Sequence, residues 1–334
     1  MASLNIIPYD AVEAALSEEN ESLREQREYN TTFHTREEIT AVLPNMQHFG
    51  SEEQPWILLS PWLDLIMSSR GLAEIDVHRI LLPGTFLIQL IHASQVGLHM
   101  HRISGDDAED LAAAFPTTTT RGDHIEDLLQ HNKFFVRLDA CSLKDAHIGQ
   151  GPIKNVRDLW MRLATSARGM TGIRDLRKLD ISTPIYMYLF PWQDDMRTEL
   201  EYRVYCAPPT GRIAAISQYK WHTRWYHADA KEKHEGYAER LVQSCGKLHE
   251  KIMAHPAMTS LLESRGFVFD VVEDPDTQDV KLIELNDFGA MSGCGACLFH
   301  WIRDARVMYG MNEKVEVRVA ALKRLDDIYG IPCR

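Results

Sequence analysis

The feature that most constrains this chain is a pair of apolar segments joined by a short polar turn. The first segment is Gly266-Phe-Val-Phe-Asp270-Val-Val, the turn is Pro275-Asp276-Thr277-Gln278, and the second segment is Val280-Lys-Leu-Ile-Glu284-Leu-Asn286. Two apolar strands around a polar turn predict a β-hairpin. The fold must therefore include an antiparallel sheet that accommodates acidic side chains.

Three oxygen-bearing side chains converge in this predicted hairpin. Glu284 and Asn286 point to the same face of one strand and lie about 7 Å apart, because a strand alternates its side chains. Antiparallel pairing brings Asp270 close to Glu284, within about one residue of register. Two carboxylates and an amide oxygen suit Mg²⁺, which completes its coordination with water and nucleotide phosphates. The alternative is a solvent-facing polar edge, but such apolar strands indicate burial, where a carboxylate needs a cation or a hydrogen-bond donor.

Composition excludes several classes of protein. The chain has 334 residues, 45% of them hydrophobic and 25% charged, as in globular proteins. A net charge of −12 argues against nucleic acid as a partner, since that would require clustered Lys and Arg. The acidic N-terminus does not resemble a signal peptide, and the apolar stretch 80–91 is too short to cross a membrane. Six cysteines do not suggest a disulfide scaffold, so we expect a cytoplasmic protein.

Strands and helices alternate in mixed order along the chain. Thr35 to Glu38 has the spacing of a helix capping box. The pattern predicts a helical opening over 9–42, buried strand or helix over 77–100, helices over 125–130, 155–167 and 235–253, and strands over 134–138, 185–190, 201–206 and 212–218. This order favours an α+β or α/β fold with antiparallel sheets.

Four motifs in sequence order resemble one known family. Residues 266–270 and 282–289, GFVFD and LIELNDFG, are similar to the ATP-grasp signature and, more narrowly, to the F-V-F-D … L-I-D-F-N-P-F-G segment of the cell-division-cycle protein 123 family. Residues 135–146, FVRLDACSLKDA, resemble its first phosphate-side strand and the S-x-R/K-D-A that follows. Residues 200–205, LEYRVY, and 213–218, IAAISQ, resemble its E-F-R-x-F and G-I-S-Q. The resemblance covers about residues 125–301.

The resemblance implies an α+β ATP-grasp fold, in which two lobes with antiparallel sheets clasp ATP. Residues 125–185 would form the first lobe, residues 186–334 the second lobe with the metal hairpin, and residues 1–124 a divergent N-terminal region. ATP and Mg²⁺ are the implied cofactors. Asp270, Glu284 and Asn286 would bind the metal.

The same resemblance assigns further residues to the nucleotide. Arg137 stands where the family has a phosphate-binding lysine, and Arg203 is a second phosphate cation; both are our candidates for catalysis. Lys144 is a weaker phosphate candidate, with surface lysine as the alternative. Residues 188–190 are the predicted hinge whose backbone meets adenine, namely Tyr188, Leu189 and Phe190.

The sequence departs from the family in two places. Glu284 stands where the family usually has Asp, although Glu is common among ATP-grasp enzymes. The first 120 or so residues lack the family's W-Y-P-x-F segment and its acidic D-D-E-x-E tract. This departure leaves the shared partner in doubt.

Two functions fit these observations. One is an ATP-dependent carboxylate–amine ligase that acts through an acyl phosphate on a small metabolite or a peptide. In that chemistry the protein mainly positions reactants and neutralises phosphoryl charge. The other is an ATP-binding assembly factor for the eukaryotic translation initiation factor 2 complex, the role of the resembled family. The missing N-terminal segments favour the ligase.

Three further features have structural and functional interpretations. Cys294 and Cys297 form a lone C-x-x-C, which suits a Gly-rich loop better than a zinc or thioredoxin-like site. Trp221, His222 and Trp225 would line an acceptor pocket or simply pack in the core. Residues 149–151 would form a flap over phosphates or an ordinary turn.

Overall fold

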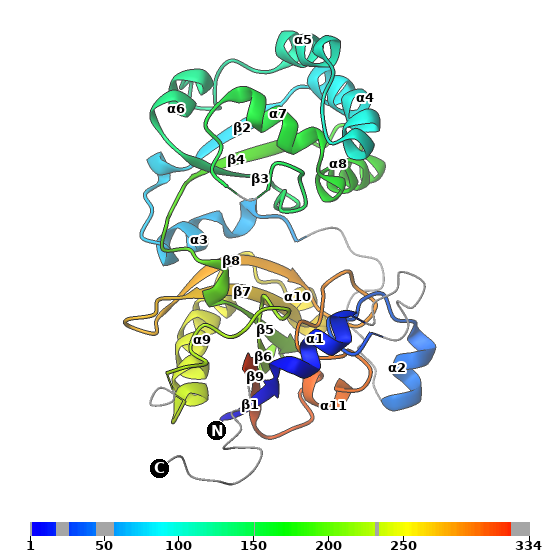
Figure 1. Cartoon of the computed structure of the whole chain (residues 1–334), viewed down its shortest axis with the longest axis vertical. Coiled ribbons are helices and arrows are strands. Elements are labelled where there is room, and N and C mark those ends of the chain that lie inside the picture. The colour runs from blue at the N-terminus through cyan, green and yellow to red at the C-terminus, as the bar shows by residue number, and fades with distance from the viewer. Residues whose placement is uncertain (1, 18–26, 45–56, 150, 231–233, 322–334) are drawn as a thin grey trace. The chain divides into compact units, whose positions relative to one another are not determined.

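The computed structural model describes residues 2–17, 27–44, 57–149, 151–230 and 234–321. The chain divides into two compact units, one comprising Met1–Gln54 with Asp195–Arg334 and the other Pro55–Asp194. We name them the six-stranded unit and the three-stranded unit after their sheets (Figure 1). No helix of the described residues combines the length and the apolar composition that a membrane crossing needs.

The three-stranded unit has one antiparallel sheet in the order β2-β4-β3. Its strands are β2 His78–Leu82, β3 Phe134–Leu138 and β4 Ile185–Pro191, and its helices are α3 Leu63–Ser69, α4 Gly84–Met100, α5 Gly105–Ala114, α6 Ile125–His131, α7 Val156–Ala164 and α8 Ala167–Leu179. Ile80, Val136 and Met187 share one sheet face and are fully buried in a core with residues of α4, α6, α7 and α8. The other face carries the polar and aromatic residues described below.

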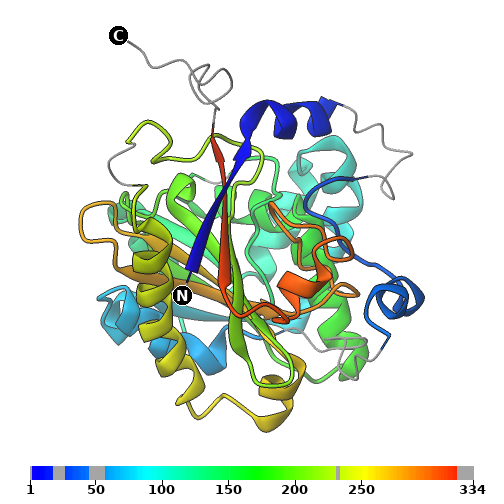
Figure 2. The ribbon, with the colours of Figure 1, turned by 90° about the horizontal axis from the view of Figure 1, so that it is seen from below.

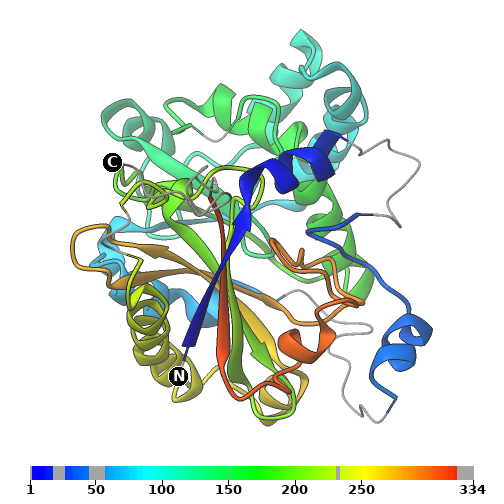
Figure 3. The same ribbon diagram turned by 60° about the horizontal axis from the view of Figure 1, so that its bottom comes forward.

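The six-stranded unit has a mixed sheet in the order β1-β9-β6-β5-β7-β8. Its strands are β1 Ala2–Pro8, β5 Glu201–Ala207, β6 Arg212–Gln218, β7 Phe267–Glu273, β8 Val280–Asp287 and β9 Val315–Ala321, and its helices are α1 Tyr9–Ser17, α2 Arg36–Val42, α9 Tyr237–Met253, α10 Ser260–Arg265 and α11 Ala305–Met308. Strand β9 runs parallel to both β1 and β6, whereas the other pairs are antiparallel. Figures 2 and 3 show β1 and β9 side by side at one edge.

The structure confirms the mixed α+β class and most predicted elements. The capping box is present, because Thr35 accepts a hydrogen bond from the backbone of Glu38, which in turn accepts one from the backbone of Thr35. The predicted helix over 9–42 is interrupted, since residues 27–35 are not helical. Strands β1 and β9 were not predicted. Their pairing joins the two ends of the unit, a long-range contact that local patterns do not reveal.

The boundaries between the units differ from the predicted ones. The region 1–124 is divided, because β2 pairs with β4 in the three-stranded unit whereas β1 pairs with β9 in the six-stranded unit. Residues 186–194, assigned to the second lobe from the sequence, belong to the three-stranded unit because β4 is the central strand of its sheet.

Helix α9 covers one face of the six-stranded sheet over a buried polar cluster. The hydroxyl of Tyr237 lies 2.6 Å from Glu273, to which it donates, and 2.7 Å from the hydroxyl of Tyr202. The indole of Trp225 donates to the hydroxyl of Tyr202 at 2.7 Å. The Nε2 atom of His227 lies 3.2 Å from Glu273. Tyr202 neighbours Arg203 along β5, so this cluster lies on the sheet face opposite Arg203. The structure thus gives Trp225 a packing role.

Candidate functional site

The hairpin β7–β8 brings the three predicted metal ligands together. Asp270 pairs directly with Glu284, as predicted, and the amide Nδ2 of Asn286 donates to Oδ2 of Asp270 at 3.0 Å. Asp270 is fully buried and Glu284 is 5% exposed. Directly paired antiparallel residues share a sheet face, so Asp270 and Glu284 are neighbours on the face where Asn286 meets Asp270.

Arg203 compensates the buried charge of Asp270. It pairs with Asp270 across β5 and β7 and donates two hydrogen bonds, from Nε to Oδ1 and from Nη2 to Oδ2, each of 2.8 Å. The guanidinium also lies 4.8 Å from the ring centroid of Tyr219. Burial lowers the pKa of Arg203, but the Asp270 carboxylate together with the nearby Cys294 and Cys297 raises it, so the pKa lies well above its usual value. Arg203 therefore stays charged and orients the Asp270 carboxylate.

The donor set of this hairpin fits Mg²⁺. Asp270 accepts three hydrogen bonds, and a carboxylate has about four lone-pair positions, so one position is left for a cation. Asn286 uses its Nδ2 atom toward Asp270, which leaves its Oδ1 atom as an oxygen donor. Within the described ranges, no group of three or more His, Cys, Asp and Glu residues is arranged to hold a metal. A magnesium ion at this hairpin would need water or phosphate oxygens to complete its coordination.

A polar row extends from this hairpin across the whole sheet. The strand registers place one residue of each strand in line on the same face, in the order Asn5, Arg318, Ser217, Arg203, Asp270 and Glu284. The sequence analysis missed Asn5, Arg318 and Ser217, because their alignment depends on the parallel pairing of β9 with β1 and β6. The four residues on β5 to β8 are buried, whereas Asn5 is exposed and Arg318 is half-buried. Buried polar residues in line across four strands are unusual and mark this part of the face as chemically distinct.

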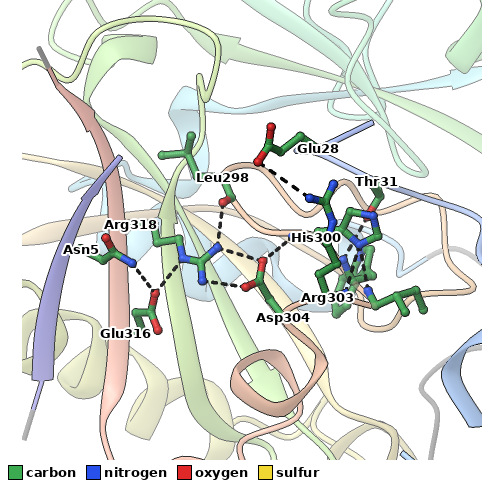
Figure 4. Close-up of polar contacts among 11 residues, drawn as sticks. Asn5, Glu28, Thr31, Leu298, His300, Arg303, Asp304, Glu316 and Arg318 are labelled. Atoms are coloured by element: carbon green, nitrogen blue, oxygen red, sulfur yellow. Dashed lines mark hydrogen bonds and ion pairs between the residues drawn. The ribbon is translucent and has the colours of Figure 1, made fainter. Parts of the chain in front are cut away.

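The loop 288–304, which follows β8, is anchored to this row. Arg203 donates from Nη1 to the carbonyl of Gly295 at 3.0 Å, and Ser217 accepts from the backbone of Leu298 at 3.0 Å. Arg318 binds the Leu298 carbonyl and forms two hydrogen bonds with Asp304, of 2.7 and 2.8 Å (Figure 4). The polar row therefore fixes the path of the loop beside the hairpin β7–β8.

His300, in the same loop, makes the stability of this region depend on pH. Burial, together with the nearby Arg303 and His34, lowers its pKa from 6.5 to about 4. Between pH 6.5 and 4, His300 is therefore protonated in the unfolded chain and neutral in the folded chain. The contribution of His300 to the free energy of unfolding is fully present above pH 6.5. It is lost as the pH falls from 6.5 to 4.

We expect the unfolding temperature of the His300→Asn variant to depend less on pH across this window than that of the wild type. Asparagine retains an acceptor for the backbone amides of Ile302 and Arg303, which bind Nδ1 of His300. Thermal unfolding at several pH values measures the slope. His99→Asn changes an exposed histidine and serves as the control. An equal slope in wild type and His300→Asn would contradict the assignment.

The three-stranded sheet brings together several predicted nucleotide residues. Arg79 on β2, Tyr188 on β4 and Arg137 on β3 are direct neighbours in register and share one face. Phe190 lies on that face too, with the guanidinium of Arg70 located 5.3 Å from its ring centroid. Aromatic rings beside arginines suit a base and its phosphates. Arg79 and Arg70 were not predicted, because neither lies in a matched motif.

Leu189 and Lys144 occupy different positions. Leu189 is fully buried on the opposite face and packs in the apolar core, so only its backbone is available to a ligand. Lys144 is half-buried in the loop after β3. Its neighbour Asp145 accepts hydrogen bonds from the hydroxyl of Ser166 at 2.6 Å and from the backbone of Arg168 at 3.0 Å, and so holds the start of α8. Roles for Lys144, Arg137 and the hinge residues stay predictions.

The remaining features have structural explanations. Burial raises the pKa of Cys294 to about 12, which disfavours a reactive thiolate. The carbonyl of Cys294 accepts from the indole of Trp301 at 2.9 Å. Trp221 packs against an apolar cluster that includes Tyr29, with 6.3 Å between the ring centroids. Gln150, the centre of the predicted flap, lies outside the described residues.

Comparison with known proteins identifies the fold. No family model and no curated protein matches the chain. The structure of Cdc123 from Schizosaccharomyces pombe is similar, with a TM-score of 0.52 and 20% identity, covering 88% of this chain and 100% of that chain. A C-terminally truncated Cdc123 from the same organism gives 0.54 and 19% over the same shares. The chain thus shares the fold of Cdc123, which confirms the resemblance at the level of the fold and extends it beyond residues 125–301.

Proposed function

We propose that this chain binds Mg-ATP, with Asp270, Glu284 and Asn286 as the metal ligands. The observation that carries the proposal is the buried cluster in which Asp270 pairs with Glu284 and is bonded by Asn286 and Arg203. Burying a carboxylate costs free energy unless a cation or hydrogen-bond donors compensate its charge. Arg203 forms an ion pair with Asp270, and a magnesium ion would add positive charge beside the same carboxylate.

We further propose that the bound nucleotide serves an assembly function rather than ligation. The likeness to Cdc123 extends over that protein's whole chain, which supports a shared mode of action. The partner would then be the translation initiation factor 2 complex, as in the resembled family. Carboxylate–amine ligation is the second candidate, and it is supported by the absence of the family's N-terminal W-Y-P-x-F and D-D-E-x-E segments from this sequence.

Two measurements on the purified chain separate these functions. The first is ADP release in the presence of ATP, Mg²⁺ and either pooled amino acids or a cell extract. The second is binding of the purified gamma subunit of initiation factor 2, with and without ATP. We expect ATP binding without substrate-dependent ADP release, together with ATP-dependent binding of the subunit. ADP formed in proportion to an added amine and carboxylate would establish the ligase instead.

A further inference from the structure

A short N-terminal segment lies along the loop that follows the metal strand. We call residues 29–34 the arm. Its backbone donates from Phe33 to the carbonyl of Ser292 at 3.2 Å and from His34 to the carbonyl of Ala290 at 2.8 Å. The hydroxyl of Thr31 accepts from the backbone of Trp301 at 3.0 Å. The arm thus belongs to the six-stranded unit although more than 250 residues separate it from the loop in sequence.

Asn30 binds Cys297 in the loop through both its backbone and its side chain. Its backbone N–H donates to the carbonyl of Cys297 at 2.8 Å, and its side-chain Oδ1 accepts from the backbone N–H of Cys297 at 3.1 Å. Both residues have a φ of 52°, in the left-handed region that non-glycine residues rarely adopt. Phe33, also in the arm, has a φ of 54°. Strained backbone held by reciprocal hydrogen bonds tends to occur at functional sites.

Gly295 connects Asn30 to the metal hairpin. A Cβ atom at this position would lie 2.1 Å from Oδ1 of Asn30, so only glycine fits under that side chain. The carbonyl of Gly295 accepts from Arg203 at 3.0 Å and from the hydroxyl of Tyr205 at 3.3 Å. Arg203 in turn holds both oxygens of Asp270. A continuous series of contacts therefore runs from the arm to the predicted metal ligand.

We infer that Asn30 is a positioning residue for the metal site and acts through Gly295 and Arg203 on Asp270. The side chain of Asn30 fixes the loop so that the Gly295 carbonyl meets Nη1 of Arg203. This carbonyl helps to orient the guanidinium of Arg203. The guanidinium in turn orients the carboxylate of Asp270 toward the cation. Partners that orient a metal ligand typically change metal affinity 10- to 100-fold when they are removed. The inference rests on the proposed Mg-ATP binding.

The test compares variants of Asn30 in the full-length chain by calorimetric titration of ATP with and without Mg²⁺. Asn30→Gly retains the left-handed backbone but removes the side-chain acceptor, so we expect Mg-ATP to bind about 10-fold more weakly. ATP without Mg²⁺ should bind as it does to the wild type. Asn30→Asp keeps an acceptor for Cys297 and should stay within about 2-fold of the wild type. Thr32→Ala, in the same arm, is the matched control.

The outcomes distinguish this inference from the proposed function. A loss confined to the Mg²⁺-dependent part of binding supports a positioning role, because a purely structural role would lower the unfolding temperature without changing the Mg²⁺ dependence. If Asn30→Gly binds Mg-ATP as tightly as the wild type while Asn286→Ala does not, the inference is overturned and the proposed function is still supported. If the wild type itself fails to bind Mg-ATP, both are wrong. Asn30→Ser, with a shorter acceptor, serves if Asn30→Gly does not fold.

Discussion

Replacing Arg203 by Met is expected to destabilise the six-stranded unit by about 3–5 kcal/mol, because it leaves the carboxylate of Asp270 buried without its cation. The side chains of Arg203 and Asp270 are 8% and 1% exposed, so water cannot substitute for the lost partner. Since whole domains are stable by about 5–15 kcal/mol, this loss is large. Urea unfolding followed by circular dichroism measures it as a lower midpoint.

The double variant Arg203→Met with Asp270→Leu is the matched control for this prediction. Replacing a buried ion pair by apolar residues of similar volume is often neutral for stability. We therefore expect the double variant to unfold near the wild-type midpoint while it no longer binds Mg-ATP. That combination would indicate that the pair is kept for the nucleotide site rather than for stability. An unchanged midpoint in Arg203→Met alone would show that the pair is not buried as described.

The sequence reveals the hairpin well because its signals are local. The turn at residues 275–278 separates two apolar strands, and this spacing predicts Asp270 close to Glu284 to within about one residue. Their direct pairing depends on a register shift between Asp270 and Val271, which the sequence does not show. The pairing of Arg203 with Asp270 follows from β5 lying beside β7, which no local pattern specifies. Arg203 was selected from a family motif as a phosphate cation, and its bidentate contact with Asp270 became visible only in the structure.

The N-terminal region shows where prediction from one sequence reaches its limit. The capping box at Thr35 is a local signal and was predicted correctly. Strand β1 and the arm around Asn30 are stabilised by partners near the other end of the chain, on β9 and on the loop 288–304. Neither periodicity nor a motif identifies contacts over such separations. Because the N-terminal region lacks the family's motifs, the sequence did not reveal that β1 and the arm belong to the six-stranded unit.

Removing the amide of Asn286 is expected to weaken Mg-ATP binding by about 100-fold, because an oxygen ligand of the predicted metal site is lost. Asn286→Ala is preferred to a substitution of Asp270 because it leaves the ion pair with Arg203 intact and should fold. Glu284→Gln removes the negative charge of a second predicted ligand and should also weaken Mg-ATP binding. Calorimetric titration with Mg-ATP, and with ATP in the presence of EDTA, separates the metal contribution from that of the nucleotide.

A carboxylate elsewhere in the same hairpin provides the control for this last prediction. Asp279 is exposed in the turn, and its backbone amide bonds to the hydroxyl of Thr277, so Asp279→Ala removes a negative charge without touching the metal group. Its Mg-ATP affinity should equal that of the wild type. If Asn286→Ala and Asp279→Ala bind Mg-ATP equally well, the oxygen atoms on β7 and β8 do not hold the metal. The buried pair of Arg203 and Asp270 would then need a purely structural explanation.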